Sequence, residues 1–253
     1  MPSREARVIA IIPARLASTR FPRKALAADT GRPLVEHVAE AAARASSVSE
    51  VLVATDSPEI ADTVASFGGR AVLTRADHPN GASRIAEACD TLGVPDDAII
   101  VNVQGDEPEI EPDTIDACVD ALRGADAPVS TIAAPFEPGE DPTDPNIVKV
   151  AIDRRGRALY FSRAPIPFQR EGSAAAAPLR HVGLYAYRRP FLRTYTGLAP
   201  TPLEQTERLE QLRILEHGRA IKVAVRPCRH VGIDTPDQYA AFVRRWRKAH
   251  PLA

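Results

Sequence analysis

Short, continuous apolar runs recur through the first 135 residues, with helical patterns between them. The runs are Val8–Ile12, Val51–Thr55, Ala71–Thr74, Ile99–Val103 and Val129–Ala133. Runs this short and apolar are typical of strands buried on both faces of a sheet. Strand alternating with helix predicts an α/β fold whose mostly parallel sheet has helices on both faces. Ligands of such sheets bind beyond the carboxyl ends of the strands, so the loops after these runs are the informative ones.

The segments between the runs carry helix start signals. Pro33 suits the first position of a helix, and Ser57 before Pro58 and Glu59 is a typical N-cap and first turn. We expect helices over 33–45, 58–67, 84–92 and 112–122.

After about residue 135 the rhythm changes. Four prolines mark an extended connection, and the Asp153–Gly156 turn predicts a hairpin between 147–152 and 158–161. Further expected elements are a strand over His181–Arg188, one amphipathic helix over Leu203–Glu216, a strand over Ala220–Val225 and a helix over Pro236–Lys248. We expect residues 1–253 to form one domain, in which 136–253 add an antiparallel insertion that forms a lid or an interface.

Composition excludes several classes of protein. The 32 basic and 33 acidic residues give a net charge of -1, which disfavours nucleic-acid binding by bulk electrostatics. Cys89, Cys118 and Cys228 are odd in number and far apart, so neither a disulfide framework nor a structural zinc site is expected. No apolar run approaches the roughly 20 residues of a membrane helix, and Val8–Ile12 is too short for a signal peptide. We expect a cytoplasmic protein without a membrane partner.

The loop after the first strand is the most specific feature. Between Pro13 and Lys24 it carries four cations and two hydroxyls, at Arg15, Ser18, Thr19, Arg20, Arg23 and Lys24. Cations and backbone amides at a strand's carboxyl end can hold a polyphosphate. The loop has neither the GxxxxGK[ST] nor the GxGxxG pattern. The alternative is a solvated basic loop.

Two aspartates are candidate metal ligands. Asp106 follows Gly105 directly after a buried strand, and Asp234 precedes a helix start. Magnesium binds one or two carboxylates together with substrate phosphates and water. The alternative for both residues is capping of a helix or turn.

Other polar residues are candidates for a second ligand. His181 and Tyr185 fall on the same face of their strand, with Gly183 between them, and they can line a pocket or pack in the core. Arg163 can bind a carboxylate or lie on the surface. Glu210 and Gln211 lie off the apolar stripe of their helix, which by itself indicates exposure.

Together these motifs resemble the 3-deoxy-manno-octulosonate cytidylyltransferase family, over about residues 8–245. The matching blocks are 12–15, 18–20, Pro22, Lys24, 54–56, 74–78, 102–108, 160–164, 180–185, 209–213 and 234–236. The resemblance implies a nucleotide-diphospho-sugar transferase fold with a Rossmann-like sheet, and a homodimer formed through the insertion. It also implies the reaction: CMP passes from CTP to the anomeric hydroxyl of a 3-deoxy-2-ulosonic acid, with Mg2+ as cofactor and pyrophosphate as product.

The resemblance also implies residue roles, with nucleotide binding in 1–135 and sugar-acid binding and dimerisation in 136–253. Catalysis would fall to Arg15, Lys24, Asp106 and Asp234, of which the two aspartates would bind the metal. The nucleotide would contact Ala14, Arg15, Ser18, Arg20, Lys24, Arg75, Arg84, Gln104 and Asp106. The sugar acid would contact Gln104, Arg163, His181, Tyr185, Glu210 and Gln211.

Departures from the family pattern leave some points open. Arg23 stands where the family usually has glycine, and Asn80–Ser83 replaces Ser-Gly-Thr followed by an acidic residue. The segment Ala164–Leu179 is shorter than usual. The particular ulosonic acid, the strictness for CTP, the pathway and the number of metal ions therefore stay open.

Two alternative functions remain: another sugar or sialic-acid nucleotidyltransferase of this fold, or a non-catalytic nucleotide-binding homologue. A nicotinamide dehydrogenase is disfavoured, because the chain lacks the GxGxxG glycine fingerprint.

Overall fold

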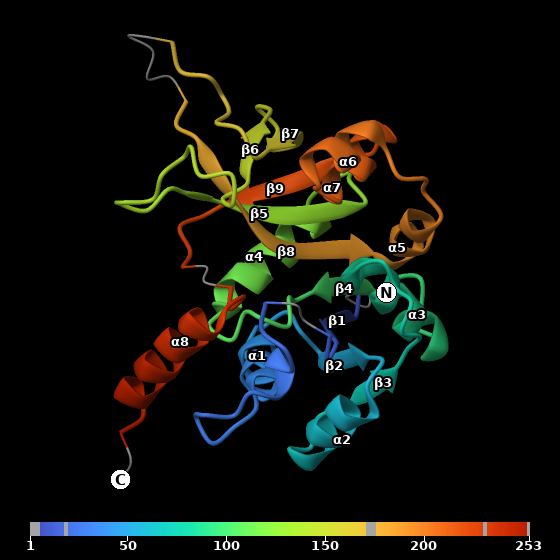
Figure 1. Ribbon diagram of the computed structural model, residues 1–253. Helices are drawn as coiled ribbons and strands as arrows, with labels where there is room; N and C mark the ends of the chain where they lie inside the picture. Colours follow the sequence, from blue (N-terminus) through green and yellow to red (C-terminus); the bar gives the residue numbers. More distant parts are fainter. Residues whose placement is uncertain (1–5, 18–19, 171–175, 230–231, 252–253) are drawn as a thin grey trace.

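The computed structural model describes residues 6–17, 20–170, 176–229 and 232–251, and within them nine strands form one sheet (Figure 1). The strands are β1 (Val8–Ala14), β2 (Glu50–Thr55), β3 (Ala71–Leu73), β4 (Ile99–Asn102), β5 (Val129–Pro135), β6 (Lys149–Ile152), β7 (Ala158–Ser162), β8 (Leu179–Arg188) and β9 (Ile221–Val225). The helices are α1 (Leu34–Ala43), α2 (Pro58–Ser66), α3 (Gly81–Thr91), α4 (Pro112–Arg123), α5 (Arg189–Thr196), α6 (Pro202–Glu207), α7 (Gln211–Glu216) and α8 (Pro236–Ala249), and a short 3-10 helix, η1, covers Lys24–Leu26.

The sheet has the strand order β3-β2-β1-β4-β8-β5-β9. Pairings β1 with β2, β1 with β4 and β2 with β3 are parallel, as the alternating pattern predicts. Strand β9, from the part expected to be an antiparallel insertion, also pairs in parallel, with β5. The carboxyl ends of β1 and β4 lie side by side, with Ile11 opposite Asn102. The basic loop and the loop of Asp106 therefore leave the sheet at the same edge.

The position of β8 differs from the expectation of an added insertion. This strand lies between β4 and β5 and is antiparallel to both, so it belongs to the central sheet. Among the described strands, the hairpin of β6 and β7 stands off the main strand order, and it pairs with β8 where Lys149 lies opposite Arg180. Segments from both halves of the chain thus form one sheet.

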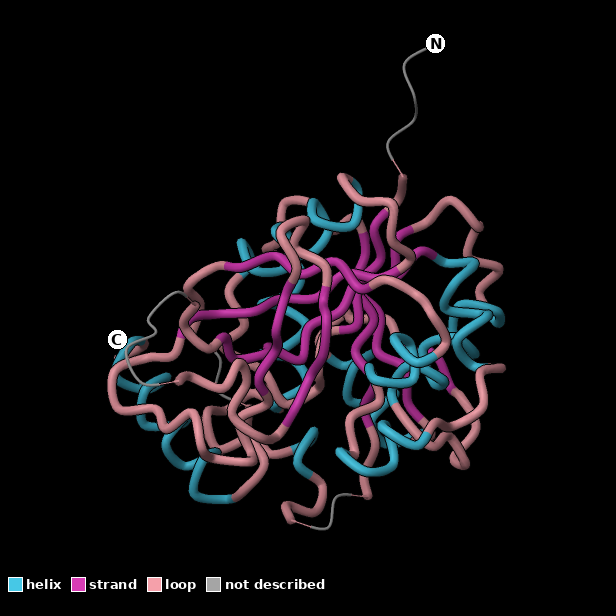
Figure 2. Tube along the Cα trace, turned by 90° about the horizontal axis from the view of Figure 1, so that it is seen from above, coloured by secondary structure: helices cyan, strands magenta, loops and turns pink. Residues whose placement is uncertain are grey.

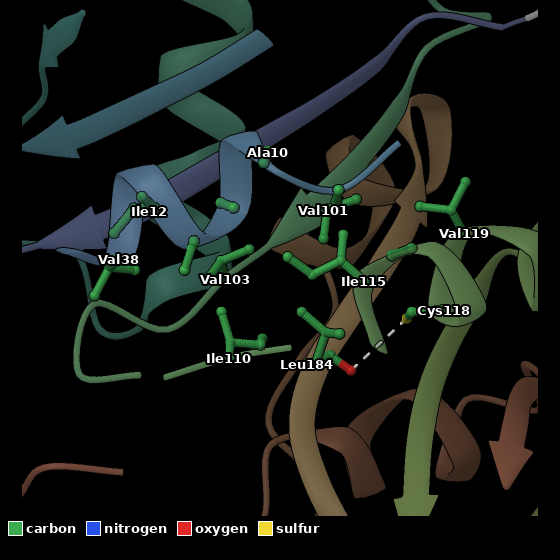
Figure 3. Packing of buried hydrophobic residues seen from close by; sticks show 14 of the residues in the cluster. Ala10, Ile12, Val38, Val101, Val103, Ile110, Ile115, Cys118, Val119 and Leu184 are labelled. Carbon is green, nitrogen blue, oxygen red and sulfur yellow. Dashed lines mark hydrogen bonds between the residues drawn. The ribbon is translucent and has the colours of Figure 1, made fainter. Parts of the chain in front are cut away.

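Alternation along β1 divides the core into two layers. Val8, Ala10 and Ile12 face the layer that contains α1, α2 and α4, whereas Ile9 and Ile11 face the layer of α3, α5 and α7. Figure 3 shows part of the first layer, where Ile12 lies near Val38 of α1. Figure 2 shows the strands in the middle of the molecule with helices outside them. The layers hold the strand ends rigidly, and thus the loops that follow them.

Two expected helices need correction. The helix expected over Leu203–Glu216 is two helices, because Arg208 ends α6 in the left-handed region at φ 52°. Helix α3 begins at Gly81 rather than at Arg84, because the Asn80 side chain caps it by accepting a hydrogen bond from the Ser83 N–H at 2.8 Å. Helix α5, directly after β8, had no expected counterpart.

Helix α8 packs against α1 through a small third core. Buried Tyr239 and Phe242 of α8 contact Leu34, and the Phe242 ring meets that of His37 edge-on at 5.2 Å. The Thr235–Gln238 capping box fixes the start of α8. This docking brings Asp234, immediately before α8, to the end of the sheet where β1 and β4 finish.

The three cysteines are buried free thiols. Burial raises the pKa of Cys118 to about 12 and the pKa of Cys89 to about 11. Among the described helices, none has the length and apolar character needed to cross a membrane.

Candidate active site

A cavity of about 720 Å3 opens beyond the carboxyl ends of β1 and β4. It is lined by residues of the basic loop, the start of α3, the loop after β4, and the segments before α7 and α8. Its lining comprises Pro13, Ala14, Arg15, Ala17, Arg20, Lys24, Ala25, His78, Pro79, Asn80, Gly81, Arg84, Gln104, Gly105, Asp106, Glu210 and Asp234. The structure therefore gathers both aspartates and most of the predicted nucleotide-binding residues in one place.

Lys24 is the central cation of this cavity. Its ammonium donates to Asp106 Oδ2 at 2.8 Å and to the Ile233 carbonyl at 2.6 Å, and it lies 3.4 Å from Asp234 Oδ1. Arg20 pairs with the other oxygen of Asp234 at 3.0 Å. Two carboxylates from segments far apart in the sequence thus converge on a single positive charge.

Backbone conformation explains how Lys24 and Asp106 come together. Arg23, directly before Lys24, adopts φ 59°, a left-handed conformation that glycine takes easily and other residues rarely take. Gly105 packs so tightly that an added Cβ would lie 2.9 Å from the Pro13 carbonyl oxygen. This close approach places the loop of Asp106 against the base of the basic loop.

The α3 side of the cavity holds Arg84. Its buried guanidinium donates to Thr74 Oγ1 at 2.7 Å and lies 3.4 Å from Asp56 Oδ1. His78 lies close by, and its ring nitrogens contact Ser83 Oγ at 3.2 Å and Glu87 Oε2 at 2.5 Å. The sequence prediction omitted His78, Asn80 and Gly81 from the cavity. Asn80 could have indicated them, because it is a typical N-cap residue and therefore marks the start of a helix. The first turn of a helix that follows a strand commonly faces the ligand in such folds.

Of the residues expected around a sugar acid, Gln104 and Glu210 line the opposite side of the cavity, whereas His181 and Tyr185 do not line it. Gln104 donates to the Gly183 carbonyl at 3.2 Å, which joins the cavity to the His181–Tyr185 row of β8. His181 contacts Thr131 Oγ1 at 3.0 Å, and its ring lies 5.5 Å from that of Tyr185, on the same face as predicted. Gly183 is the residue of this row that contacts Gln104.

Glu210 extends this side of the cavity. Solvent reaches its side chain, yet the surrounding protein removes enough water from the carboxyl to raise its pKa above 4.5, against the lowering effect of Arg213 and Arg15. The pKa of buried Tyr185 is also raised, first by burial and then by the charge of Glu210. The carboxyl oxygens of Glu210, which lines the cavity, can accept hydrogen bonds from hydroxyl groups of a ligand.

Not every predicted residue lies on the cavity wall. Arg75 is exposed and its Nε donates to Glu87 at 3.0 Å, and Gln211 is buried at the start of α7. Arg163 donates to main-chain carbonyls away from the wall. The roles expected for these residues remain predictions. Ser18 lies outside the described residues.

The donor set can be tested against a metal ion. Among the described residues, no group of three or more His, Cys, Asp or Glu side chains is placed to hold a metal. Asp106 and Asp234, which already share one cation, are a pair of hard oxygen donors. They fit a magnesium ion whose remaining ligands come from phosphate oxygens and water.

Sequence relationships agree with this geometry. The pattern of the Cytidylyltransferase family matches residues 9–221. The chain is 50% identical over 239 residues to the 3-deoxy-manno-octulosonate cytidylyltransferase of Syntrophobacter fumaroxidans, covering 94% of this chain and 96% of the relative. The chain belongs to the 3-deoxy-manno-octulosonate cytidylyltransferase family. The relative of that name from Yersinia enterocolitica is 50% identical over 236 residues, which confirms the resemblance inferred from the motifs.

Solved structures confirm the fold of this cytidylyltransferase family member. A CMP:2-keto-3-deoxy-manno-octonic acid synthetase complexed with CTP matches with a TM-score of 0.90 and 37% identity, over 96% of this chain and 100% of that one. A cytidylyltransferase from Leptospira borgpetersenii, at 16% identity and a TM-score of 0.61, shares the fold.

Proposed function

We propose that this chain transfers CMP from CTP to the anomeric hydroxyl of 3-deoxy-manno-octulosonate, releasing pyrophosphate. The observation that carries the proposal is the convergence of Asp106 and Asp234 on Lys24 at the base of a cavity rich in arginine. Membership of the cytidylyltransferase family agrees with it, and so does the likeness to a synthetase solved with CTP.

The nucleotide is proposed to occupy the cavity between the basic loop and α3. Arg15, Arg20 and Lys24 would hold the triphosphate, because their cations neutralise charge at the phosphates. The wall around Ala14 and Arg84 would hold the nucleoside. Arg75 and Ser18 are further candidates at the rim of this nucleotide site.

Asp106 and Asp234 would hold Mg2+. When bound, the ion would neutralise phosphate charge and make the attacking hydroxyl more acidic. Lys24 would then move from the carboxylates to the triphosphate, because binding of a divalent ion removes the negative charge that holds the ammonium.

The sugar acid would lie on the β8 and α7 side of the cavity. Gln104, backed by His181 and Tyr185, is placed to orient it, and Glu210 faces the same space. Arg163 and Gln211 are further candidates from the resemblance. Phosphoryl transfer depends mainly on positioning and charge stabilisation, so this set of residues needs no strong general base.

We also propose a homodimer in the cytoplasm. Leu159 of β7 and Phe168 are large apolar side chains with 62% and 84% exposure, and both lie in the second part of the chain. Three free, buried thiols suit a reducing compartment. If light scattering gives a molar mass equal to that of one chain, the dimer is excluded.

The decisive experiment measures pyrophosphate release with CTP, Mg2+ and 3-deoxy-manno-octulosonate, with EDTA as the blank. Release that needs all three supports the proposal. Asp106→Asn is expected to lose at least about 100-fold in turnover, and near-normal turnover would remove the metal assignment. Release with a different ulosonic acid or nucleotide, but not with these, would replace the proposed substrates.

A further inference from the structure

Lys149 of β6 is a completely buried cation at some distance from the cavity wall. Its relative exposure is 0%, and its ammonium donates to the main-chain carbonyls of Asp144 at 2.9 Å, Ile147 at 2.6 Å and Arg163 at 2.5 Å. A lysine ammonium has three N–H donors, so these bonds use all of them. Burying a charge is costly unless it is fully hydrogen-bonded, and here backbone oxygens satisfy it. Lys149 therefore joins the connection before β6 to the end of β7.

Arg163 continues this network toward α6. Its guanidinium donates to the carbonyls of Glu207 at 2.8 Å, Pro145 at 2.8 Å and Arg208 at 3.4 Å. The Glu207 carboxylate also accepts hydrogen bonds from Ser162 Oγ at 2.7 Å and from the Arg163 N–H at 2.9 Å. Donors at the end of β7 thus bind both the main chain and the side chain at the end of α6.

The carbonyls of Glu207 and Arg208 lie where the chain breaks between α6 and α7. The last carbonyls of a helix have no partner within it, and Arg163 supplies donors for two of them. Arg208 takes its left-handed conformation at this point, and Leu209 is then buried in the core. The next residue is Glu210, which lines the cavity. The direction of Glu210 therefore depends on how this break is held.

We propose that Lys149 and Arg163 are positioning residues, whose cations hold six main-chain carbonyls and so fix the α6–α7 break that presents Glu210 to the cavity. The sugar-acid side of the cavity is then set in part by Lys149, which does not itself line the cavity. This inference rests on the proposed function for the statement that Glu210 faces a sugar acid. Arg163 acts in it through the backbone of 207–208.

The first test needs no substrate. Hydrogen–deuterium exchange of peptides covering 203–216 is compared between the wild type and Lys149→Met. The break loses its support in the variant, so exchange in this segment is expected to rise at least about tenfold, the effect of one lost charged hydrogen bond. Lys222→Met is the matched control, because Lys222 also donates to a main-chain carbonyl, that of Arg155, at the opposite end of the hairpin. The control is expected to leave 203–216 unchanged.

The second test measures kinetics. In Lys149→Met, KM for 3-deoxy-manno-octulosonate is expected to rise about tenfold while KM for CTP stays within about twofold. Lys149→Arg, which keeps a buried cation, is expected to recover part of the loss. In a Glu210→Gln background the effect of Lys149→Met is expected to vanish, because both changes act through one side chain.

Certain results would overturn the inference. Unchanged hydrogen–deuterium exchange in 203–216 of Lys149→Met would show that Lys149 does not hold the break between α6 and α7. Additive effects of Lys149→Met and Glu210→Gln on KM would show that Lys149 does not act through Glu210. If Lys149→Met fails to fold, Glu207→Gln, which weakens the same network at the end of α6, takes its place with the same two readouts. If the wild type does not use the sugar acid, the proposed function fails, and the exchange experiment alone decides whether the network holds the break.

Discussion

Replacing Lys24 with methionine tests whether its ammonium occupies the place of a metal ion. The substitution keeps an unbranched side chain of similar length and removes the charge that lies between Asp106 and Asp234. Two consequences are expected: the protein without ligand loses stability, and the freed carboxylates bind Mg2+ more readily.

The size of the stability loss follows from the contacts of Lys24. At 2.8 Å and an effective dielectric constant of about 20, the attraction to Asp106 is roughly 6 kcal/mol before any opposing terms. Desolvation and lost side-chain freedom offset most of this, and hydrogen bonds to charged groups contribute about 1.5–3 kcal/mol net. The Lys24 side chain is 15% exposed and that of Asp234 is 41% exposed, so we discount the second ion pair. We expect a loss of about 2 kcal/mol, which lowers Tm by about 4–8 °C for a chain of this length.

The assay is thermal unfolding in EDTA and in increasing Mg2+, without nucleotide. Wild-type carboxylates must release the ammonium before they bind a metal ion together, so the Tm of Lys24→Met is expected to rise more with Mg2+ than the wild-type Tm does. Lys248→Met, at an exposed position of α8, is the matched control. Equal Tm values in EDTA together with equal responses to Mg2+ would refute the reasoning. Turnover of the variant is expected to fall at least about 100-fold, because a cation at the triphosphate is lost.

Three further substitutions test other parts of the site. Glu210→Gln is expected to raise Tm slightly at pH 7, because a carboxyl whose pKa is raised by folding destabilises the folded state above that pKa. Melting at pH 4 should show no gain in Tm, and a gain that persists there would contradict the upward direction of the pKa shift. Gly105→Ala places a Cβ against the Pro13 carbonyl and is expected to cost about 1–3 kcal/mol in urea unfolding, whereas wild-type stability would show that the loops can separate freely. Arg84→Met is expected to raise KM for CTP about tenfold and to lower Tm. Adding Asp56→Asn should restore Tm but not KM, since it neutralises the carboxylate left unpaired. Recovery of both Tm and KM would show that the role of Arg84 is purely structural.

Local chemistry predicted the outline of the fold and much of the site. The apolar runs at Val8–Ile12 and Ile99–Val103 gave β1 and β4, because strands buried on both faces need continuous apolar residues. Ser57 caps its helix as predicted, and Thr235 caps α8 in the same way, since capping depends only on neighbouring residues. The basic loop and Asp106 follow those two strands, so their meeting at one edge of a parallel sheet could be expected.

Other features depend on contacts that no local pattern specifies. The α6–α7 break falls within a continuous helical pattern, and Arg208 has no local preference for a left-handed conformation. Its conformation is supported by Arg163, which lies 45 residues earlier. The buried role of Lys149 was missed for the same reason, because its three partners are main-chain carbonyls, which carry no signature in the sequence.

The amino-acid sequence by itself determined which faces of each strand and helix are apolar, and it placed the cations and carboxylates at strand and helix ends. Only the tertiary structure decided that β8 lies between β4 and β5, and that Lys24 meets Asp234 across 210 residues of chain. The physical reason is that periodicity and capping are properties of neighbouring residues. Strand order and the meeting of distant charges, by contrast, depend on the packing of the whole core, in which every apolar face must be covered at once.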